Sequence, residues 1–285
     1  IKDGHKTPTP EWSTFAGVVL RETVRIALTY AALNSLPVCA ADIQNAYLQA
    51  PTSEKHYIIC GPEFGLENVG KLAIIVRALY GDKSAGADYW RHVCSAMEEM
   101  DFHSCKADPE LWYRPATKSD GTEYYQYVLL YTDYILCIME EPERFLREEF
   151  HKRFVLKEKS IAPPTRYLGN KVSEVTMENS VKCWSFSSSQ YVQSAVKNVE
   201  KYLVKNNLDP LHKCKSPWPS NYRPEADISP ELPPHKASYY QSLIGILRWF
   251  VELGRADIVM ETSAMASMMA LPRKGHLKTV FQMFA

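Results

Sequence analysis

The chain has 285 residues, of which 33 are basic and 33 acidic, so its formal net charge is zero. Hydrophobic residues make up 46% and charged residues 23%, which is typical of a folded protein and excludes a disordered chain. Neutrality argues against nucleic-acid binding through bulk charge alone, but it leaves room for a local basic face. No apolar run approaches the roughly 20 residues of a membrane-spanning helix, so we expect no membrane partner.

The amino-terminal half is predicted to alternate between helices and short strands. Apolar residues at helical spacing predict a helix over residues 14–36, which Pro37 ends. A short apolar strand at 38–41 follows and leads directly into Asp42. The other elements predicted before residue 110 are strands at 56–60 and 72–76 and a helix at 87–100.

The middle of the chain is rich in aromatic and branched residues, which favour strands. Two such strands, 124–131 and 135–139, are separated by a few residues and should pair as a hairpin that bends at Tyr131-Thr132-Asp133-Tyr134. Asp120-Gly121 predicts a further turn. The remaining elements are strands at 111–114, 166–169, 172–177 and 182–186, a charged helix at 142–154, and a helix at 190–204 with Ser188 as N-cap.

The last part of the chain is Pro-rich and then helical. Seven prolines between 210 and 234 exclude a regular helix there and predict a linker that runs over a surface. Helices are predicted at 237–253, at 257–271 and after Pro272. The order of elements is α+β, without the βαβ alternation of a parallel sheet. Four methionines at helical spacing are predicted to be core residues: Met260, Met265, Met268 and Met269.

The two termini indicate a longer reading frame, and the cysteines indicate the redox compartment of the protein. It begins without Met, residues 1–6 lack the apolar core of a signal peptide, and it ends inside an apolar helical pattern. We therefore expect a segment of a longer reading frame. Seven dispersed cysteines without a Cys-x-x-Cys pair favour reduced thiols in an intracellular protein. Together with the absence of His-x-x-x-His or His-Glu-x-x-His spacing among the eight histidines, they argue against a zinc site.

Positive charge is concentrated in one third of the chain. Residues 143–215 contain 14 Lys and Arg residues against 8 Asp and Glu residues, so this region carries +6 and the remainder −6. Two interpretations remain open, namely solvated helix faces and an electrostatic track for a phosphate backbone.

Two aspartates lie next to predicted apolar strands. Asp42 follows the strand at 38–41, and Asp133 lies at the hairpin bend. Carboxylates in such places are costly unless they are paired, hydrogen-bonded or bound to a cation, and a hard divalent ion relieves the repulsion between two of them. An Asp at a bend is more often a turn residue, so spacing alone leaves both roles open. Asp108, before Pro109, is predicted to be a turn or cap residue.

The order of several motifs resembles the reverse transcriptases of copia-type retrotransposons. Asp42-Ile43-Gln44-Asn45-Ala46-Tyr47 is similar to their first catalytic motif, an Asp followed by an Ala-aromatic pair. The other matching segments are Leu79-Tyr80-Gly81-x-Lys83, Ala107-Asp108-x-x-Leu111-Trp112, Leu130-Tyr131-Thr132-Asp133-Tyr134, Tyr167-Leu168-Gly169, Ser189-Gln190-Tyr191-Val192, Tyr240-Gln241-Ser242-Leu243-Ile244-Gly245, Arg255-Ala256-Asp257-Ile258, Pro272 and His276.

The resemblance implies a right-hand polymerase fold, with a palm of antiparallel strands, partial fingers and a helical thumb or connection region. Residues 1–208 would form the partial fingers and palm, 209–235 a Pro-rich linker, and 236–285 the thumb or connection region. The fingers segment upstream and the RNase H domain downstream would lie outside this chain. The family copies a template by phosphoryl transfer from a dNTP to a primer 3′-hydroxyl with two Mg²⁺ ions.

Residue roles follow from the same resemblance. Asp42 and Asp133 would be the catalytic metal ligands, and the carbonyl of Ile43 would join them. Tyr47 would pack under the sugar and reject a 2′-hydroxyl, although a core aromatic remains the alternative. Lys83 and Ser84 would lie in the nucleotide-binding segment.

The resemblance also implies the partners and the location of the chain. The partners would be an RNA or DNA template–primer, dNTP, and the other polyprotein parts, RNase H and integrase. The location would be intracellular and cytoplasmic, in a virus-like particle, with nuclear access.

Three departures from the family pattern concern the same site. Tyr134 stands where the family has a second hairpin Asp, and a phenol with a pKa near 10 is a poor Mg²⁺ ligand. Asp82 replaces a Leu and would place negative charge near the triphosphate, and Ser84 replaces a longer Gln. We therefore expect impaired activity and a doubtful second ion site. The alternatives are a non-catalytic nucleic-acid-binding remnant and a decayed genomic copy.

Overall fold

The structure is a computed structural model that describes residue 10, residues 13–167 and residues 169–285. The predictions made for residues 1–6 and for Leu168 lie outside these residues. The chain divides into two compact units, which are described separately. The first comprises Ile1–Pro164 and Glu174–Trp184, and the second comprises Thr165–Ser173 and Ser185–Ala285.

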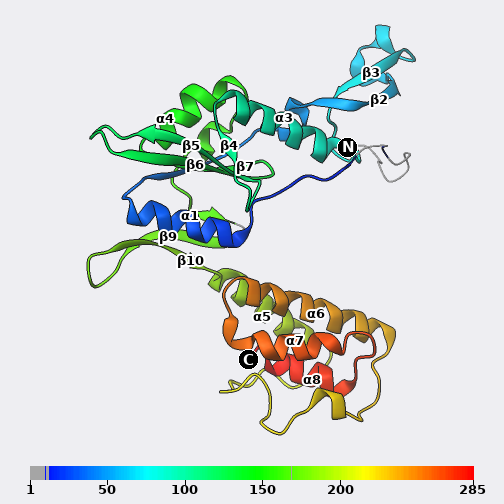
Figure 1. The fold of residues 1–285 in the computed structure, drawn as a ribbon. Helices are drawn as coiled ribbons and strands as arrows, with labels where there is room; N and C mark the ends of the chain where they lie inside the picture. The colour runs from blue at the N-terminus through cyan, green and yellow to red at the C-terminus, as the bar shows by residue number, and fades with distance from the viewer. Residues whose placement is uncertain (1–9, 11–12, 168) are drawn as a thin grey trace. The chain divides into compact units, whose positions relative to one another are not determined.

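The first unit is built on a five-stranded antiparallel sheet, which confirms a mixed helix and antiparallel-sheet architecture (Figure 1). The predicted hairpin forms its centre, because two apolar strands that follow each other closely pair most directly. The strand order is β1 (Val38–Asp42), β7 (Tyr134–Ile138), β6 (Glu123–Tyr131), β5 (Leu111–Thr117) and β4 (His103–Ser104).

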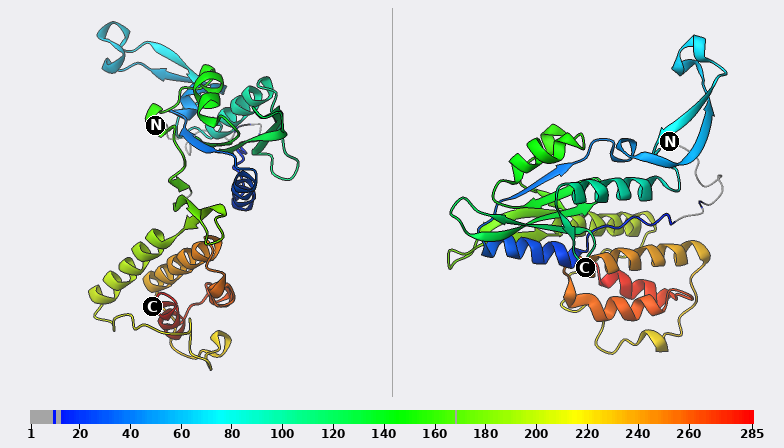
Figure 2. Two further views of the ribbon diagram at one scale, coloured as in Figure 1. Left: turned by 90° about the vertical axis from the view of Figure 1, so that its left-hand side faces the viewer. Right: turned by 45° about the horizontal axis from the view of Figure 1, so that its top comes forward.

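Helices cover both faces of this sheet, which explains why four of the five residues of β7 are buried. Helix α3 (Ala85–Glu99) and the run that begins with α4 (Pro142–Arg144) lie on one face, and α1 (Arg21–Leu33) lies on the other (Figure 1). Figure 2 shows the same two layers from other sides. The buried residues of β7 therefore contact a helix layer on each side of the sheet.

The first helix is shorter than predicted. It begins at Arg21, whereas the apolar pattern predicted a start at residue 14. Long-range hydrogen bonds fix the preceding segment as extended chain: Val19 N–H donates to the carbonyl of Leu130 at 3.0 Å, and Leu20 N–H donates to the carboxylate of Asp108 at 2.9 Å. Buried Asp108 thus supports the entry into α1, in agreement with its prediction as a turn or cap residue.

The charged helix predicted at 142–154 is an irregular helical run. After α4 it continues as a π-helical turn, Phe145–Glu149, and a 3₁₀ turn, Phe150–Lys152. A π turn places residues five apart on one side, so Phe145 and Phe150 both enter the core, with ring centroids 6.2 Å apart. The prediction of a regular helix was wrong because this packing requires a wider turn.

A two-stranded ribbon extends from the first unit. It consists of β2 (Pro51–Ile59) and β3 (Leu72–Arg77) and forms a separate antiparallel sheet (Figure 2). Its base is attached to α3 through buried Asp88, which accepts a hydrogen bond from Ser53 N–H at 3.0 Å and forms an ion pair with Arg91. Burial alone would raise the pKa of Asp88, but the bonds from Ser53 and the charge of Arg91 hold this pKa below its usual range.

Replacing Asp88 with Asn is expected to lower the free energy of unfolding at pH 7 by about 2 kcal/mol, because charge-assisted hydrogen bonds are lost. A group with a lowered folded-state pKa stabilises the protein above its unfolded pKa and stops doing so as the pH falls through the folded value. The difference between the two proteins should therefore begin to shrink as the pH falls below about 4 and vanish once it is below the lowered pKa of Asp88. Urea unfolding at several pH values measures it, and a pH-independent difference would contradict this account.

The second unit is a helical bundle with its own core. Its longest helix begins with the Pro pair at 233–234, three residues before the predicted start, because Pro suits the first helical position. The third helix begins at Val259 after a 3₁₀ turn and ends at Ser267, four residues earlier than predicted. The four helices are α5 (Ser189–Lys205), α6 (Pro234–Glu252), α7 (Val259–Ser267) and α8 (Lys274–Gln282).

A three-stranded sheet has its residues divided between the two units. Its strand order is β10 (Lys182–Ser187), β9 (Asn170–Thr176) and β8 (Arg166–Tyr167). The strands predicted at 172–177 and 182–186 are therefore confirmed within two residues at their ends. Of the strand predicted at 166–169, residues 166 and 167 are confirmed, Gly169 lies in a turn with a positive φ of 81°, and Leu168 is not described.

The Pro-rich segment is part of the second unit and packs against its hydrophobic core. Leu211, Trp218, Tyr222 and Leu232 contact its hydrophobic core, and a ring nitrogen of buried His276 lies 2.9 Å from the carbonyl oxygen of Pro224. The segment is irregular, as the prolines predicted, with one 3₁₀ turn, Pro224–Ala226. The assignment of 209–235 as an interdomain linker, and of the flanking ranges as polymerase subdomains, stays a prediction.

Two further expectations concern single residues. Among the four methionines predicted to be core, Met265 is fully buried, but Met260 is 75% exposed because it lies on the outer face of α7. All seven cysteines are free thiols, and Cys39, Cys60 and Cys137 are buried. Over the described residues, no helix combines the length and apolar character needed to cross a membrane.

Candidate active site

Asp42 and Asp133 lie on neighbouring strand ends of the central sheet. Asp42 is the last residue of β1 and stands directly opposite Tyr134, the first residue of β7. One step further, Ile43 N–H donates a hydrogen bond of 2.7 Å to the carbonyl of Asp133. The structure therefore brings together the backbones of these two residues, which are 91 positions apart in the sequence.

The hairpin bend is tight and held in place. Tyr131 and Tyr134 form the closing pair, so only Thr132 and Asp133 make the turn. Thr132 has a positive φ of 52°, which is unfavourable for a β-branched residue. The hydroxyl of Tyr89 on α3 donates to the carbonyl of Thr132 at 3.1 Å, and this bond helps to hold the strained turn.

The backbone of Asp42 is equally well fixed. Its N–H donates to the hydroxyl of Ser160 at 2.8 Å, and its carbonyl accepts a hydrogen bond from Lys157 N–H at 2.9 Å. Asp42 and Asp133 are both half-buried. Two carboxylates on rigid, adjacent strand ends are a suitable start for a divalent-ion site, because the scaffold fixes the ligand positions.

Tyr134 adds a neutral group to this arrangement. Burial, and then the charge of Asp42, raise the pKa of Tyr134 above its usual range. The phenol therefore stays protonated at neutral pH and supplies no negative charge. The position opposite Asp42 consequently lacks the anionic ligand that an aspartate would provide.

Tyr47 lies in a cluster of tyrosines near the bend. Its ring stacks on Tyr80 with centroids 4.8 Å apart and lies 5.6 Å from the ring of Tyr89. Burial, Tyr80 and Asp133 raise the pKa of Tyr47. Tyr47 is half-buried, packs against the hydrophobic core and also borders a cavity, so both of its predicted roles remain open.

This cavity has a volume of about 210 Å³ and lies beside the bend. Its lining includes Tyr47, Tyr89, Trp90, Glu110 and Thr132. Glu110 is buried and accepts a 2.6 Å hydrogen bond from the indole of Trp90. Burial raises the pKa of Glu110, and the negative charge of Asp108 raises it further. The hydrogen bond from Trp90 lowers this pKa but does not cancel the rise.

The predicted nucleotide-binding segment 83–84 leads into α3. Lys83 is half-buried, and its backbone N–H donates to the carboxylate of Asp82 at 3.0 Å. The side chain of Ser84 is fully buried, so a direct contact with a nucleotide would require the start of α3 to move. The nucleotide-binding roles of Lys83 and Ser84 stay predictions.

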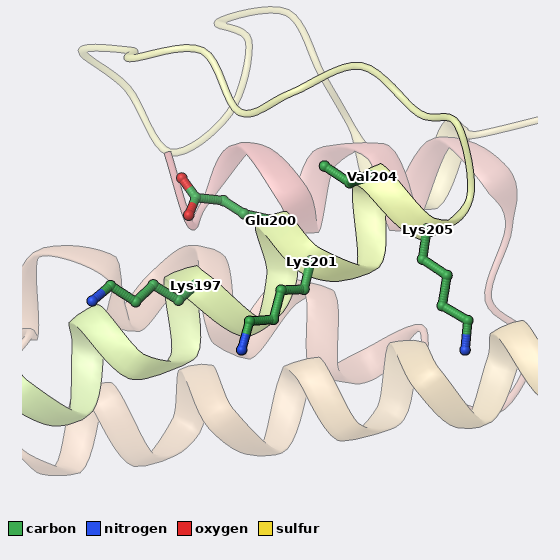
Figure 3. Close-up of a pocket in the computed structure, with 5 residues that line it drawn as sticks. All are labelled: Lys197, Glu200, Lys201, Val204 and Lys205. Carbon is green, nitrogen blue, oxygen red and sulfur yellow. The ribbon is translucent and has the colours of Figure 1, made fainter.

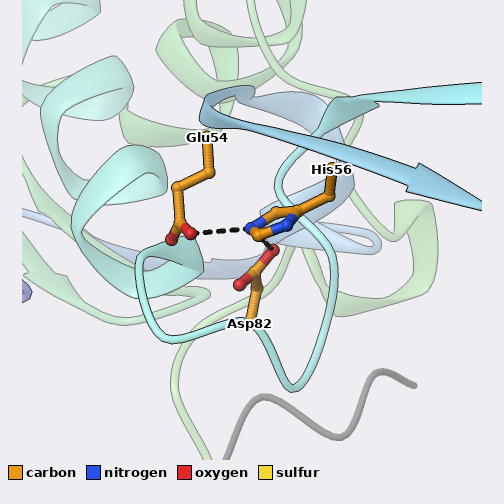
Figure 4. Close-up of side chains that lie close together, drawn as sticks. All are labelled: Glu54, His56 and Asp82. Atoms are coloured by element: carbon orange, nitrogen blue, oxygen red, sulfur yellow. Dashed lines mark hydrogen bonds and ion pairs between the residues drawn. The ribbon is translucent and has the colours of Figure 1, made fainter. Parts of the chain in front are cut away.

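Asp82 lies in a cluster with two side chains of β2. Its side chain is only 1% exposed and lies 3.6 Å from His56, whose Nε2 also lies 2.6 Å from Glu54 (Figure 4). Within the described residues, these three form the one group of at least three metal-ligating side chains whose ligand atoms all lie within 4.8 Å of one another. The structure thus places Asp82 beside His56 and Glu54, and its effect on a bound triphosphate stays a prediction.

Some basic side chains of the region 143–215 form ion pairs with carboxylates, and others do not. Arg144 and Arg147 form ion pairs with neighbouring glutamates, and Arg153 pairs with Glu99. Lys197, Lys201 and Lys205 instead follow one face of α5, beside Glu200 and Val204 (Figure 3). No carboxylate in the described part of the chain lies within ion-pair distance of these three lysines.

Sequence reasoning missed two features of this site. Tyr89 and Asp88 lie in the helix predicted at 87–100, and nothing in the sequence connects them to Thr132 and Ser53. Glu54 and His56 are two residues apart and therefore share a strand face, which was an available signal. Asp82 joins them only through the fold.

Comparison with known proteins identifies the family to which the sequence is similar. A family model described as reverse transcriptase (RNA-dependent DNA polymerase) matches residues 7–210. The putative transposon Ty5-1 protein of Saccharomyces cerevisiae is 23% identical over 241 residues, which cover 84% of this chain and 72% of that protein.

A second relative is much longer than this chain. The retrovirus-related Pol polyprotein from transposon RE1 of Arabidopsis thaliana is 22% identical over 270 residues. The match covers 94% of this chain but only 17% of the polyprotein. No solved structure matches the chain significantly.

Proposed function

The chain belongs to the copia-type reverse transcriptase family, and from this premise we propose that its first unit is the palm and part of the fingers of an RNA-directed DNA polymerase. The observation that carries the proposal is the meeting of Asp42 and Asp133 on adjacent strand ends, joined by the bond from Ile43 to Asp133. Its substrates would be a template–primer of RNA or DNA and a dNTP.

The donor set fits one hard divalent ion. Asp42 and Asp133 supply two carboxylates, and the backbone carbonyl of Ile43 supplies a third oxygen, which is the ligand chemistry that Mg²⁺ prefers. When bound, such an ion stabilises negative charge on the reacting phosphate. Tyr134 supplies no anionic oxygen, so the second ion of the family is held poorly, if at all, in this proposal.

The remaining residues would position the substrates. Tyr47 would support the sugar of the incoming nucleotide, because its ring is fixed between Tyr80 and Tyr89 and one side borders the cavity. Tyr89 would keep Asp133 in place through its bond to Thr132. The reaction would join the 3′-oxygen of the primer to the α-phosphorus of the dNTP and release pyrophosphate, while the primer hydroxyl loses its proton.

The same proposal includes impaired catalysis. Phosphoryl transfer depends on positioning and charge stabilisation, so the loss of one anionic ligand is expected to lower the rate by about 100-fold or more. The raised pKa of Tyr134 supports this view because the phenol stays neutral.

The wider context of the chain is also part of the proposal. The RE1 relative is a polyprotein of which this chain spans 17%, so we propose that RNase H and integrase parts accompany it in a larger product. We place the second unit in the thumb or connection region, and the protein inside the cell, in cytoplasmic particles with nuclear access.

A manganese titration tests the proposed ion site. Mn²⁺ replaces Mg²⁺ at oxygen ligands and is visible by electron paramagnetic resonance. We expect Asp42→Asn to remove most of the Mn²⁺ bound in the millimolar range, because one of two carboxylates is lost. The matched control is Asp101→Asn, an exposed aspartate at a left-handed position that Asn also tolerates. Equal binding by both variants would contradict the proposed site.

The second candidate function is nucleic-acid binding without catalysis. It is favoured by the unneutralised lysine face of α5, formed by Lys197, Lys201 and Lys205 (Figure 3). This function would survive the loss of the second ion. It predicts binding that depends strongly on salt and weakly on sequence.

A further inference from the structure

We propose that Glu54, His56 and Asp82 form a binding site for a divalent transition-metal ion, for which Zn²⁺ is the best match. This site lies at the base of the ribbon formed by β2 and β3, and it is separate from Asp42 and Asp133 (Figure 4). It does not depend on the proposed polymerase activity.

The positions of the ligand atoms suit a small ion. With metal–ligand distances of about 2.0–2.1 Å, neighbouring atoms of a tetrahedral zinc site lie roughly 3.4 Å apart. The Nε2 of His56 lies 3.6 Å from Asp82 and 2.6 Å from Glu54, and all three atoms lie within 4.8 Å of one another. Side-chain rotations that change these distances by about 1 Å would complete three of the four positions, and water would supply the fourth.

Charge and ligand type also favour a transition metal. Two carboxylates and a neutral imidazole carry a total charge of −2, which a divalent cation cancels. The three side chains are at most 20% exposed, so a bound cation would lie in a largely desolvated place. Imidazole is a good ligand for zinc and a poor one for Mg²⁺ or Ca²⁺, so the single histidine selects against the hard ions.

The ligands are held before an ion arrives. The carboxylate of Asp88 anchors Ser53, and the hydroxyl of Thr52 accepts a hydrogen bond from Glu54 N–H at 3.2 Å, which fixes the strand that carries Glu54 and His56. One oxygen of Asp82 accepts Lys83 N–H, so the other oxygen faces His56. Such supporting contacts commonly change metal affinity 10- to 100-fold.

Binding of the ion would stabilise the base of the ribbon. The ion would connect β2 to the turn that precedes α3, two segments that are otherwise joined through Asp88 and the adjoining backbone. We therefore expect Zn²⁺ to raise the thermal stability of the protein and to protect the base of the ribbon from proteolysis.

Titration with Co²⁺, followed by displacement with Zn²⁺, tests the site because the visible spectrum of Co²⁺ reports its ligands. We expect one tightly bound Co²⁺ per chain with nitrogen and oxygen ligands. His56→Ala and Asp82→Asn should each weaken its binding at least tenfold. His212→Ala removes an exposed histidine of the second unit and should leave the affinity unchanged, and so should Asp42→Asn.

Three results would overturn the proposal. The first is an unchanged Co²⁺ affinity in His56→Ala. The second is a thiolate-to-cobalt charge-transfer band, which would assign the ion to cysteines. The third is a dissociation constant weaker than about 1 mM for the parent chain, which corresponds to only about 4 kcal/mol of binding free energy. Circular dichroism establishes that each variant is folded. Asp82→Asn preserves side-chain shape, so its affinity decides the question if His56→Ala fails to fold.

Discussion

Replacing Tyr134 with Asp is expected to raise primer extension with Mg²⁺ by about 100-fold over the parent chain, equivalent to about 2.7 kcal/mol of activation free energy. The substitution restores an anionic oxygen opposite Asp42, where the parent has a phenol whose pKa is raised by burial and by Asp42 itself. The comparison should be made in the chain as it stands and within a longer polyprotein that supplies upstream residues.

The same substitution has a second readout that needs no catalysis. The introduced carboxylate would face Asp42 across the two strands, and like charges in such a pair cost up to about 1 kcal/mol. We therefore expect the free energy of unfolding of Tyr134→Asp to be lower than that of the parent without metal. Mn²⁺ should remove this difference by binding in a second site. Urea unfolding with and without Mn²⁺ measures this.

The control for this experiment is Tyr134→Phe, which keeps the ring and removes the hydroxyl. It should extend primers no better than the parent, because neither side chain supplies negative charge. Equal activity of the parent and Tyr134→Asp would show that the phenol does not impair catalysis. A gain in Tyr134→Phe as large as in Tyr134→Asp would show that the charge at this position is not the cause.

Replacing Lys197, Lys201 and Lys205 together with Ala is expected to weaken duplex binding between about 10- and 100-fold near 0.1 M salt. The three side chains follow each other at four-residue intervals, so they recur about every 6 Å along one face of α5. Each lysine that neutralises a phosphate adds about 0.9 to the slope of log affinity against log salt for a duplex. The variant should therefore show a slope reduced by up to about 2.7.

A matched triple variant separates this face from general charge loss. Lys236, Lys274 and Lys278 also belong to the second unit but lie on α6 and α8. Their replacement removes the same charge and should change the slope far less. Equal effects of the two triple variants would show that binding follows net charge and not the α5 face, and no binding by the parent from about 50 to 200 mM salt would remove this function.

The sequence was sufficient to predict most of the strands and helices of the first unit. Alternating aromatic and branched residues located β6 and β7, and their short separation predicted the bend at Asp133 correctly. These features depend on neighbours in the chain, so local patterns identify them. The placement of Asp42 beside that bend followed only from the resemblance to reverse transcriptases, because β1 pairs with a strand about 96 residues later.

The errors concern residues whose environment is set by distant segments. The start of α1 depends on Leu130 and Asp108, which bind the preceding backbone. The π turn at Phe145–Glu149 depends on a core that needs both Phe145 and Phe150. The neighbourhood of Asp82 and His56 was not predicted, because it forms only where β2 brings His56 against Asp82. In each case the contacting residue lies more than one helical or strand period away in the sequence, so a local pattern does not reveal the contact.

The most direct test of the central claim is an anomalous difference map from crystals soaked in Mn²⁺. The claim is that Asp42 and Asp133 hold one divalent ion and that Tyr134 removes the second. We predict a single Mn²⁺ peak at these strand ends, about 2.2 Å from carboxylate oxygens of both aspartates, and two peaks in Tyr134→Asp. An absence of any peak between Asp42 and Asp133, or two well-occupied ions in the parent protein, would contradict the claim.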